Sequence, residues 1–412
     1  MYVTAAEVRV HYLIGFVGLA CFLLLAWLPS TDRRAAAGRL PRIAVLLLLQ
    51  IALGFLLLKT GIGGTVIRAV SDTFAHILGY AAQGTAFVFG DLPSVGGSGP
   101  AFLFAVLMPI VLVSALIGIL QHLRVLPFVI KYLGLLLAWV SGFGKIESFN
   151  AVASAILGQS EVFISLRAML DDIPSQRMYT LAASAMSTVS AGILGAYMQL
   201  IDPKYVIAAI VLNMLGAFVV CSLINPYVVT AADDARLLGE EISDSRKAQS
   251  FFEMLTEYIL VGFKVAFTVA AMLIGFIALL AMINGIFAAL FHGTTFQDLM
   301  GHIFAPAAWL TGIPWDEAAA AGRFMGTKLV SNEVVAMQEL NRQHGGLSDR
   351  TVAIVSTYLV SFANFSTIAI VTGAVRSLSE KQGSVIARNG LRLLYGATLV
   401  SFLSATIVGL LS

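Results

Sequence analysis

Two short polar interruptions of apolar segments are the residues of this chain best suited to chemistry. Gly158-Gln159-Ser160-Glu161 interrupts the apolar stretch Ser148–Leu170, and Ser331-Asn332-Glu333 interrupts an apolar segment in the other half. A carboxylate at membrane depth costs at least about 2.5 kcal/mol, so each glutamate is expected to face a cavity or a partner. Two broken hydrophobic segments in corresponding places of two halves indicate a substrate site at the middle of a membrane transporter.

The composition is that of a protein embedded in lipid. Apolar residues make up 58% of the 412 residues and charged residues only 12%, about half of the roughly 25% that soluble proteins carry. A soluble fold of this length could not bury so much apolar surface, so an integral membrane protein in a lipid bilayer is predicted. The net charge of +2 and the lack of long basic runs argue against a nucleic-acid partner. The six histidines are scattered without metal-ligand spacing, so neither a metal nor an organic cofactor is expected.

Eight apolar segments approach the roughly 20 residues that a membrane-spanning helix needs. They are Tyr12–Leu28, Ile43–Leu58, Ala101–Leu120, Met178–Ile201, Tyr205–Ile224, Tyr258–Leu290, Val352–Val375 and Leu391–Leu411. Thr65–Ala82 and Arg124–Val140 are interpreted as interfacial helices. Lys145–Leu170 and Trp315–Leu340 are interpreted as re-entrant hairpins with the polar interruptions at their tips. The predicted fold class is therefore all-α, with eight transmembrane helices, two opposed re-entrant hairpins and interfacial helices.

The basic residues of the short connections predict the orientation. The first connection carries Arg33, Arg34, Arg39 and Arg42, and the last carries Arg376, Lys381, Arg388 and Arg392. Because basic short loops stay in the cytoplasm, both connections are predicted to be cytoplasmic, and so is the loop from Asp233 to Lys247. Eight spans and two hairpins then place both termini in the periplasm of a bacterial inner membrane.

The order of segments predicts an inverted repeat. An interrupted segment and two spans (145–224) are followed, after a long span, by an interrupted segment and two spans (315–411). This order divides the chain into scaffold spans and interfacial helices (1–142), a first transport repeat (143–224), a loop with a long scaffold span (225–295) and a second transport repeat (296–412). The two repeats would enter the membrane from opposite sides.

Each polar constellation allows more than one interpretation. Gln159 and Glu161 offer the donors and acceptors that a planar heterocycle needs, or they form a polar tip exposed at the interface. Glu333 suits a vicinal diol, or it pairs with Lys328 on a structural helix.

Two further polar runs lie inside predicted spans, Ser361–Thr367 and Met186–Gly192. The hydroxyls of the second run end in a glycine, which favours local unwinding that would free carbonyl groups for a cation. Helix–helix contact remains the alternative for Ser187 and Ser190.

At these residues the chain resembles the concentrative nucleoside transporter family, and its bacterial nucleoside permeases in particular. The resemblance runs from end to end in the family's order. It is carried by Ser114–His122, Glu147–Ala151, Gly158–Glu161, Ala185–Ser190, Lys328–Glu333 and Ser361–Ser366.

The resemblance implies a homotrimer in which each protomer has its own transport path. It also implies that one set of residues binds the nucleobase and another the ribose. The nucleobase set is Gln159, Ser160, Glu161, Ile193 and Phe362, and the ribose set is Glu333, Asn364 and Thr367.

Two departures from the family's sodium-coupled members concern the coupling ion. Those members use an Asn before the first hairpin tip and a Ser in the fourth span, where this chain has Ser154 and Thr188. Hard cations need several oxygen ligands, and the serine hydroxyl reaches less far than an amide. Coupling to H⁺ is therefore predicted, with Na⁺ as the alternative. Burial favours the neutral form of a carboxyl group, so Glu161 and Glu333 are candidates for the proton carrier.

The predicted function is proton-coupled import of nucleosides of the uridine, cytidine and adenosine class. An enzyme is not expected. Ser160 as the nucleophile of an intramembrane hydrolase would need a base, but no histidine lies in a central span, and Val162 stands where a nucleophile elbow has glycine. A passive channel is the remaining alternative.

Overall fold

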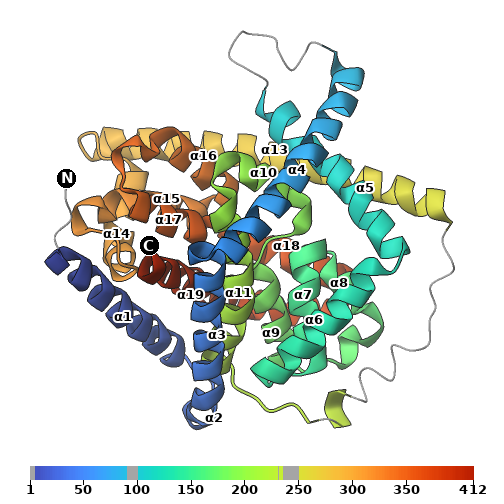
Figure 1. Cartoon of the computed structure of the whole chain (residues 1–412), viewed down its shortest axis with the longest axis horizontal. Helices are drawn as coiled ribbons and strands as arrows, with labels where there is room; N and C mark the ends of the chain where they lie inside the picture. Colours follow the sequence, from blue (N-terminus) through green and yellow to red (C-terminus); the bar gives the residue numbers. More distant parts are fainter. Residues whose placement is uncertain (1–4, 91–100, 231, 235–249) are drawn as a thin grey trace.

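The structure is a computed structural model that describes the chain except for residues 1–4, 91–100, 231 and 235–249 (Figure 1). All regular structure in the described residues is helical, as predicted. The helices of the first half are α1 (Ala5–Trp27), α2 (Arg33–Gly38), α3 (Leu40–Lys59), α4 (Gly61–Phe89), η2 (Leu103–Leu107), α5 (Pro109–His122), α6 (Val125–Ser141), α7 (Lys145–Leu157), α8 (Val162–Ser165), η3 (Arg167–Asp172), α9 (Ser175–Met186), α10 (Ala191–Leu200) and α11 (Pro203–Ile224). Those of the second half are α13 (Phe251–Leu290), α14 (Phe296–Leu310), α15 (Trp315–Val330), α16 (Glu333–Gln343), η4 (His344–Gly346), α17 (Asp349–Leu359), α18 (Phe365–Leu378) and α19 (Glu380–Leu411).

Among the described residues, six helical segments are long and apolar enough to cross a membrane. They are Leu40–Lys59, Leu103–His122, Ser175–Leu200, Pro203–Ile224, Phe251–Leu290 and Glu380–Leu411. Tyr12–Trp27 and Phe365–Leu378 are shorter apolar helices. The predicted span Val352–Val375 is divided between α17 and α18 by a break, so neither helix counts as a continuous span. The membrane-protein class is confirmed, and the number of eight spans stays a prediction.

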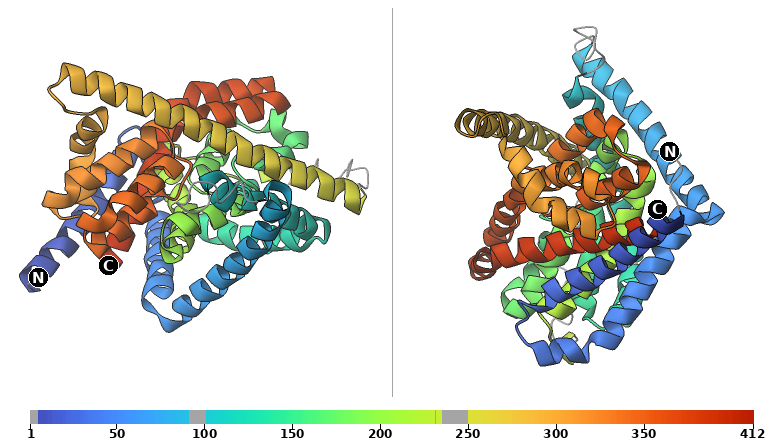
Figure 2. Two further views of the ribbon diagram at one scale, coloured as in Figure 1. Left: turned by 90° about the horizontal axis from the view of Figure 1, so that it is seen from above. Right: turned by 90° about the vertical axis from the view of Figure 1, so that its left-hand side faces the viewer.

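Two helices occupy the centre of the molecule and one long helix lies at its edge. Of the most apolar 18-residue stretch of each helix, 83% is buried in α19 and 78% in α11, but only 11% in α13. Figure 2 shows α13 running along one side of the molecule. Its 40 residues extend for about 60 Å, twice the roughly 30 Å of a bilayer's hydrocarbon core. If this helix crossed the membrane at right angles, about half of its length would lie outside the hydrocarbon core.

Several helices are longer than predicted, and one was not predicted. Helix α19, for example, begins at Glu380 rather than Leu391. The long span begins at Phe251 rather than Tyr258, because the Ser250 side chain caps its first turn. The helix predicted over Thr65–Ala82 extends over Gly61–Phe89 and is capped by Thr60. The sequence analysis did not identify α14, although Thr295 and Asp298 form a capping box at its start, a pattern that marks helix N-termini.

The predicted cytoplasmic connections lie together at one end of the molecule. Arg392 of the last connection donates to Pro29 O at 3.1 Å and to Ile224 O at 2.7 Å. Arg39 of the first connection donates to the carbonyl oxygen of Tyr227. This placement fits a common side for all three connections, as the distribution of basic residues predicts.

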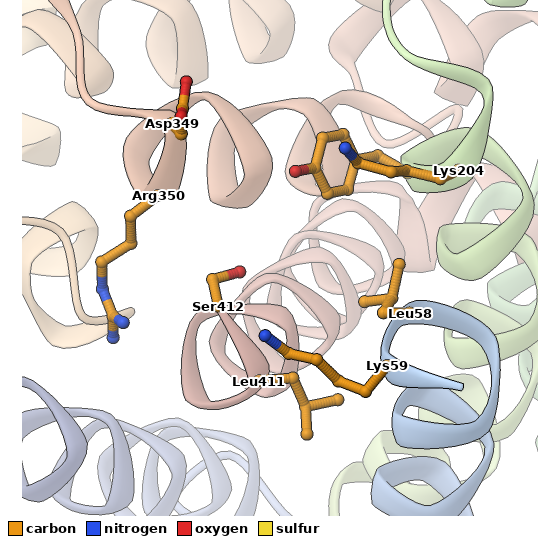
Figure 3. A pocket seen from close by; sticks show the side chains of 8 residues that line it. Leu58, Lys59, Lys204, Asp349, Arg350, Leu411 and Ser412 are labelled. Atoms are coloured by element: carbon orange, nitrogen blue, oxygen red, sulfur yellow. The ribbon is translucent and has the colours of Figure 1, made fainter. Parts of the chain in front are cut away.

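The other end carries a surface pocket of about 290 Å³. It lies between the ends of α3, α11, α17 and α19, as Figure 3 shows. The lining residues are Leu58, Lys59, Lys204, Tyr205, Asp349, Arg350, Leu411 and Ser412. The turn before α11 and the end of α19 therefore share this face. Since α1 and α19 are antiparallel, with Tyr395 bonded to Leu25 O at 2.8 Å, α1 also begins on this side. Which side faces the periplasm stays a prediction.

A buried charge cluster anchors the start of α7. Arg177 of α9 binds both carboxylate oxygens of Glu147, at 2.6 and 2.7 Å, and one oxygen of Asp234 at 2.6 Å. The second Asp234 oxygen accepts the backbone N–H of Lys145 at 2.7 Å, and Tyr227 donates to Glu147 at 2.9 Å. The Glu147 side chain is 0% exposed, so this cluster joins α7, α9 and the segment after α11 through buried ion pairs.

Arg177→Met is expected to destabilise the protein by roughly 3–5 kcal/mol, because it leaves the buried carboxylates of Glu147 and Asp234 without their counter-charge. The measurement is the melting temperature of the detergent-solubilised protein. The control is Lys204→Met, which removes a half-exposed pair with Asp202 at 2.9 Å and should cost less than about 1 kcal/mol. Equal shifts for the two variants would contradict the structural role of the cluster.

Candidate functional site

The first polar interruption breaks the helix where predicted. Helix α7 ends at Leu157, and Gly158 follows with φ 120° and ψ 169°, a conformation essentially restricted to glycine. A Cβ atom on Gly158 would lie 2.6 Å from Glu161 Oε2, so the carboxylate folds back over the glycine. Beyond the turn the chain forms only the four-residue α8 and the 3-10 helix η3. The second limb of this segment is therefore irregular rather than a full helix.

The second interruption also breaks its helix, between α15 and α16. Ser331 ends α15 with φ −102° and ψ −94°. The Asn332 side chain accepts the N–H of Val335 at 3.0 Å, so Asn332 stabilises the first turn of α16. Glu333 then opens α16 and is 5% exposed. This geometry makes the glutamate, rather than the asparagine, available to a ligand.

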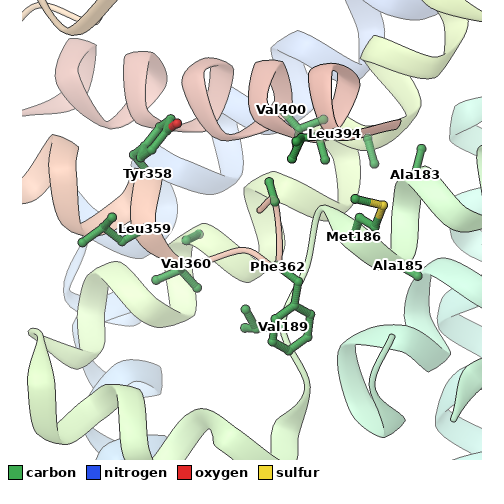
Figure 4. Close-up of a cluster of buried hydrophobic side chains, with 14 of the residues drawn as sticks. Ala183, Ala185, Met186, Val189, Tyr358, Leu359, Val360, Phe362, Leu394 and Val400 are labelled. Atoms are coloured by element: carbon green, nitrogen blue, oxygen red, sulfur yellow. The ribbon is translucent and has the colours of Figure 1, made fainter. Parts of the chain in front are cut away.

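The two polar runs inside the spans are breaks as well, and they meet. The first run separates α9 from α10 at Ser187–Ser190, and the second separates α17 from α18 at Val360–Asn364. The backbone N–H of Phe362 donates to the carbonyl oxygen of Thr188 at 3.2 Å. Figure 4 shows Val189 and Phe362 close together between the two breaks. Each half therefore contains an interrupted segment, then a span that a break divides into two helices, and then a continuous helix.

Glu333 is the centre of a hydrogen-bond network. Tyr197 donates its hydroxyl to Glu333 Oε1 at 2.7 Å, and the Asn364 amide donates to Oε2 at 3.0 Å. Asn364 Oδ1 in turn accepts the backbone N–H of Thr367 at 3.0 Å and its hydroxyl at 3.1 Å. The three residues expected on the ribose side are therefore brought together. Tyr197 was missed, because one tyrosine in the apolar helix α10 carries no signal that separates it from a packing residue.

Helix α10 connects the two interruptions. The Cβ position on Gly158 lies 3.4 Å from Cβ of Ser190, the residue that precedes α10. Tyr197, which binds Glu333, lies seven residues further along, or about 10 Å at the helical rise. Ile193 lies between them and is 6% exposed. The residues expected on the nucleobase and ribose sides thus flank one short helix.

The remaining residues of the expected nucleobase set differ in burial. Gln159 is 9% exposed, and its buried Oε1 has no hydrogen-bond partner. Phe362 is also 9% exposed, whereas Ser160 and Glu161 are half-buried. An unpaired buried acceptor is costly, and a donor from a bound molecule would remove that cost. That these residues and Glu333 form one pocket stays a prediction.

The candidate ion ligands are only partly available. Ser154 donates its hydroxyl to the Ala151 carbonyl of its own helix at 3.0 Å. Thr188 Oγ1 is buried and has no hydrogen-bond partner.

The alternative of a Lys328–Glu333 ion pair is wrong. Lys328 instead binds Tyr358 O, Ser361 and Ser401.

Discontinuous helices with polar residues at their breaks define a class, the membrane transport proteins that build their sites from such helices. Three family models match the chain. "Na+ dependent nucleoside transporter N-terminus" matches residues 17–92, "Nucleoside recognition" matches 103–204, and "Na+ dependent nucleoside transporter C-terminus" matches 205–409.

The relatives agree with the family models. The purine nucleoside transport protein NupG of Bacillus subtilis is 33% identical, over 97% of this chain and 99% of its own length. The structure is similar to a CNTnw variant in an outward-facing state, with a TM-score of 0.91, 32% identity and coverage of 98% and 99%. It is also similar to CNTnw in an inward-facing substrate-bound state, with a TM-score of 0.89, 31% identity and the same coverage. The chain belongs to the concentrative nucleoside transporter family and is not an enzyme.

Gly158→Ala is expected to lower stability by about 1–3 kcal/mol, because alanine is strained in this backbone conformation and its Cβ displaces the Glu161 carboxylate. The measurement is the melting temperature of the purified protein. Gly84→Ala is the matched control, since Gly84 lies in α4 with no atom within 4 Å of the added Cβ. An unchanged melting temperature for Gly158→Ala would show that the turn accepts a side chain.

Proposed function

We propose that this protein imports nucleosides by proton symport, and that Glu333 is the residue that holds the ribose. The observation that carries the proposal is the buried Glu333 carboxylate, oriented by Tyr197 and Asn364 at 2.7 and 3.0 Å. Each carboxylate oxygen retains acceptor capacity after these bonds. A vicinal diol supplies two donors at the spacing of two carboxylate oxygens, and the hydroxyls of a ribose ring are such a diol.

The nucleobase would lie on the side of the first interruption. Gln159 Oε1 is a buried acceptor without a partner, and Glu161 and Ser160 add polar groups that are half-exposed. Phe362 and Ile193 supply apolar surface for the faces of the base. Uridine, cytidine and adenosine all present amide-like or amine edges, so the proposed substrate class includes all three.

Glu333→Gln should abolish uptake of labelled uridine, because an amide replaces the charged acceptor. Hydrogen bonds to charged groups contribute about 1.5–3 kcal/mol each; the glutamine loses one of the two acceptors and leaves the other uncharged. Asn364→Ala should have the same effect, since it releases the Glu333 carboxylate. The measurement is uptake in transport-deficient cells, with the amount of protein in the membrane determined in parallel.

Glu339→Gln is the matched control, because the same chemical change occurs on the same helix outside the network. It should retain most of the uptake. Uptake by Glu333→Gln or Asn364→Ala at the wild-type rate would contradict the ribose assignment.

The hydroxyls at the first break favour the proton over the sodium ion. The Ser154 hydroxyl donates to Ala151 O at 3.0 Å and keeps its acceptor lone pairs, but it reaches less far than an amide oxygen and supplies only one of the several oxygen ligands that a hard cation requires. Sodium coupling is the alternative, supported by the description of the family models and by the unpaired Thr188 Oγ1. Glu161 and Glu333 are the proposed proton carriers.

Replacing sodium by choline is expected to leave uridine uptake unchanged, whereas raising the external pH or adding a proton uncoupler should decrease accumulation. Accumulation that resists the uncoupler would indicate a passive channel. A steep dependence on sodium without one on pH would overturn proton coupling.

The variant Ser154→Asn should gain sodium dependence, because the longer asparagine side chain adds an amide oxygen in the last turn of α7. The measurement is again uridine uptake with choline in place of sodium. Ala155→Asn, one residue further on the same helix, is the control for introducing an asparagine and should gain no sodium dependence.

The proposal includes an assembly and a motion. The 40-residue α13 exposes apolar side chains such as Leu260, Ile274 and Met282, and such a surface suits lipid and the neighbouring protomers of a homotrimer. Residues 143–224 and 296–412 would form the two transport repeats. The first interrupted segment and its adjoining spans would move as a block against a fixed scaffold that includes residues 258–290. The location would be the bacterial inner membrane with both termini periplasmic.

A further inference from the structure

A fully buried lysine occupies the second half of the molecule. Lys328 lies in the last turn of α15 and is 0% exposed. Its ammonium group donates to Tyr358 O at 2.5 Å, to Ser361 Oγ at 2.6 Å and to Ser401 Oγ at 3.1 Å. Nζ also lies 4.3 Å from the centroid of the Tyr358 ring. A buried charge without a paired counter-charge is costly. The contacts of Lys328 must therefore contribute something that offsets this cost.

The surrounding hydrogen bonds fit a protonated ammonium group. Ser401 donates its hydroxyl to Ala397 O at 3.2 Å. The 2.8 Å bond between the hydroxyls of Ser361 and Ser401 is then donated by Ser361. Both oxygens therefore remain acceptors, as does the carbonyl of Tyr358. An ammonium group has three donors and no acceptor, so all three of its protons are used.

The three oxygen atoms belong to the break between α17 and α18 and to the helix behind it. Tyr358 lies in the last turn of α17, Ser361 lies in the break, and Ser401 lies in α19. Tyr358 O has no helical partner, because the N–H of Phe362 donates to Thr188 O. Lys328 therefore supplies this carbonyl with a donor, and it also donates to the two serine hydroxyls. Carbonyl and hydroxyl oxygens around a break are also the ligands that hard cations prefer.

The first half has the same arrangement without a lysine. Ser154 lies in the last turn of α7, the place that Lys328 has in α15. The neighbouring break contains Thr188, whose buried Oγ1 has no hydrogen-bond partner, whereas Ser361 in the second break is bonded to Lys328. The break between α17 and α18 is thus bonded to the ammonium group of a lysine, whereas the break between α9 and α10 contains an unpaired oxygen.

We infer that the Lys328 ammonium group is a built-in cation that holds the break between α17 and α18 in its unwound form. This break therefore needs no bound ion, whereas the break between α9 and α10 has an unpaired oxygen, Thr188 Oγ1, that could bind one. The unwound form matters because Asn364 and Thr367 begin α18 directly after the break. Lys328 is in this sense a positioning residue for the Glu333 network, which makes the inference dependent on the proposed function.

The first test is Lys328→Met, which removes the charge and keeps the length of the side chain. Because misplacing a binding group by an ångström reduces rates on the order of a hundredfold, uridine uptake should fall to a few per cent. Lys264→Met in the exterior helix α13 is the matched control. Lys328→Met that is folded and retains half or more of the wild-type uptake would overturn the inference.

The second test needs no transport and uses Lys328→Ala. Propylammonium replaces the atoms that this substitution removes, and propan-1-ol has the same shape without the charge. Propylammonium should raise the melting temperature of the variant more than propan-1-ol does, and the wild type should show no such difference. Equal effects of the two additives on the variant would also overturn the inference.

The two tests separate the inference from the proposed function. A wild-type protein that takes up no nucleoside would contradict the proposed function and leave the melting-temperature result standing. Nucleoside uptake by the wild type together with full uptake by Lys328→Met would contradict only the role of Lys328.

Discussion

The bilayer offers no hydrogen bonds, so every polar group that a broken helix exposes must find its partner inside the protein. Four breaks between helices carry the polar runs in the described part of the chain, two in the interrupted segments and two in the spans α9–α10 and α17–α18. The breaks lie against one another, and Phe362 N–H donates directly to Thr188 O. Polar groups at one break are thereby hydrogen-bonded to polar groups at another. This mutual satisfaction determines where the helices pack and leaves only a few acceptors for a ligand.

The two halves satisfy their breaks differently, and the difference follows from charge. The second half places Glu333 and Lys328 on one interrupted segment, each with its own hydroxyl and carbonyl or amide partners. The first half has Glu161 at a half-exposed tip and a hydroxyl at Ser154. Two charged side chains, each held by its own hydrogen-bond partners, make the second half suited to a constant task such as holding a sugar. The less saturated first half is suited to ions and to varied bases.

The charge cluster of Glu147, Arg177 and Asp234 separates this polar centre from the basic end of the molecule. It ties the start of α7 to α9 and to the segment after α11. Buried pairs of this kind contribute little net stability but are costly to break. The cluster therefore holds the start of α7 against α9 and the segment after α11. Because the first interruption follows α7, its position relative to the end with the basic connections is fixed as well.

The amino-acid sequence determined the membrane class, the positions of most helices and all four breaks, because hydropathy and helix-breaking polar runs are local properties. It also identified Glu333, Asn364 and Thr367, which the structure joins in one network. Only the tertiary structure decided which groups pair. Tyr197 binds Glu333 from 136 positions away in the sequence, and Lys328 binds residues of α17 and α19 instead of the nearby Glu333. Partners so distant in the chain are chosen by helix packing, and local sequence carries no record of that choice.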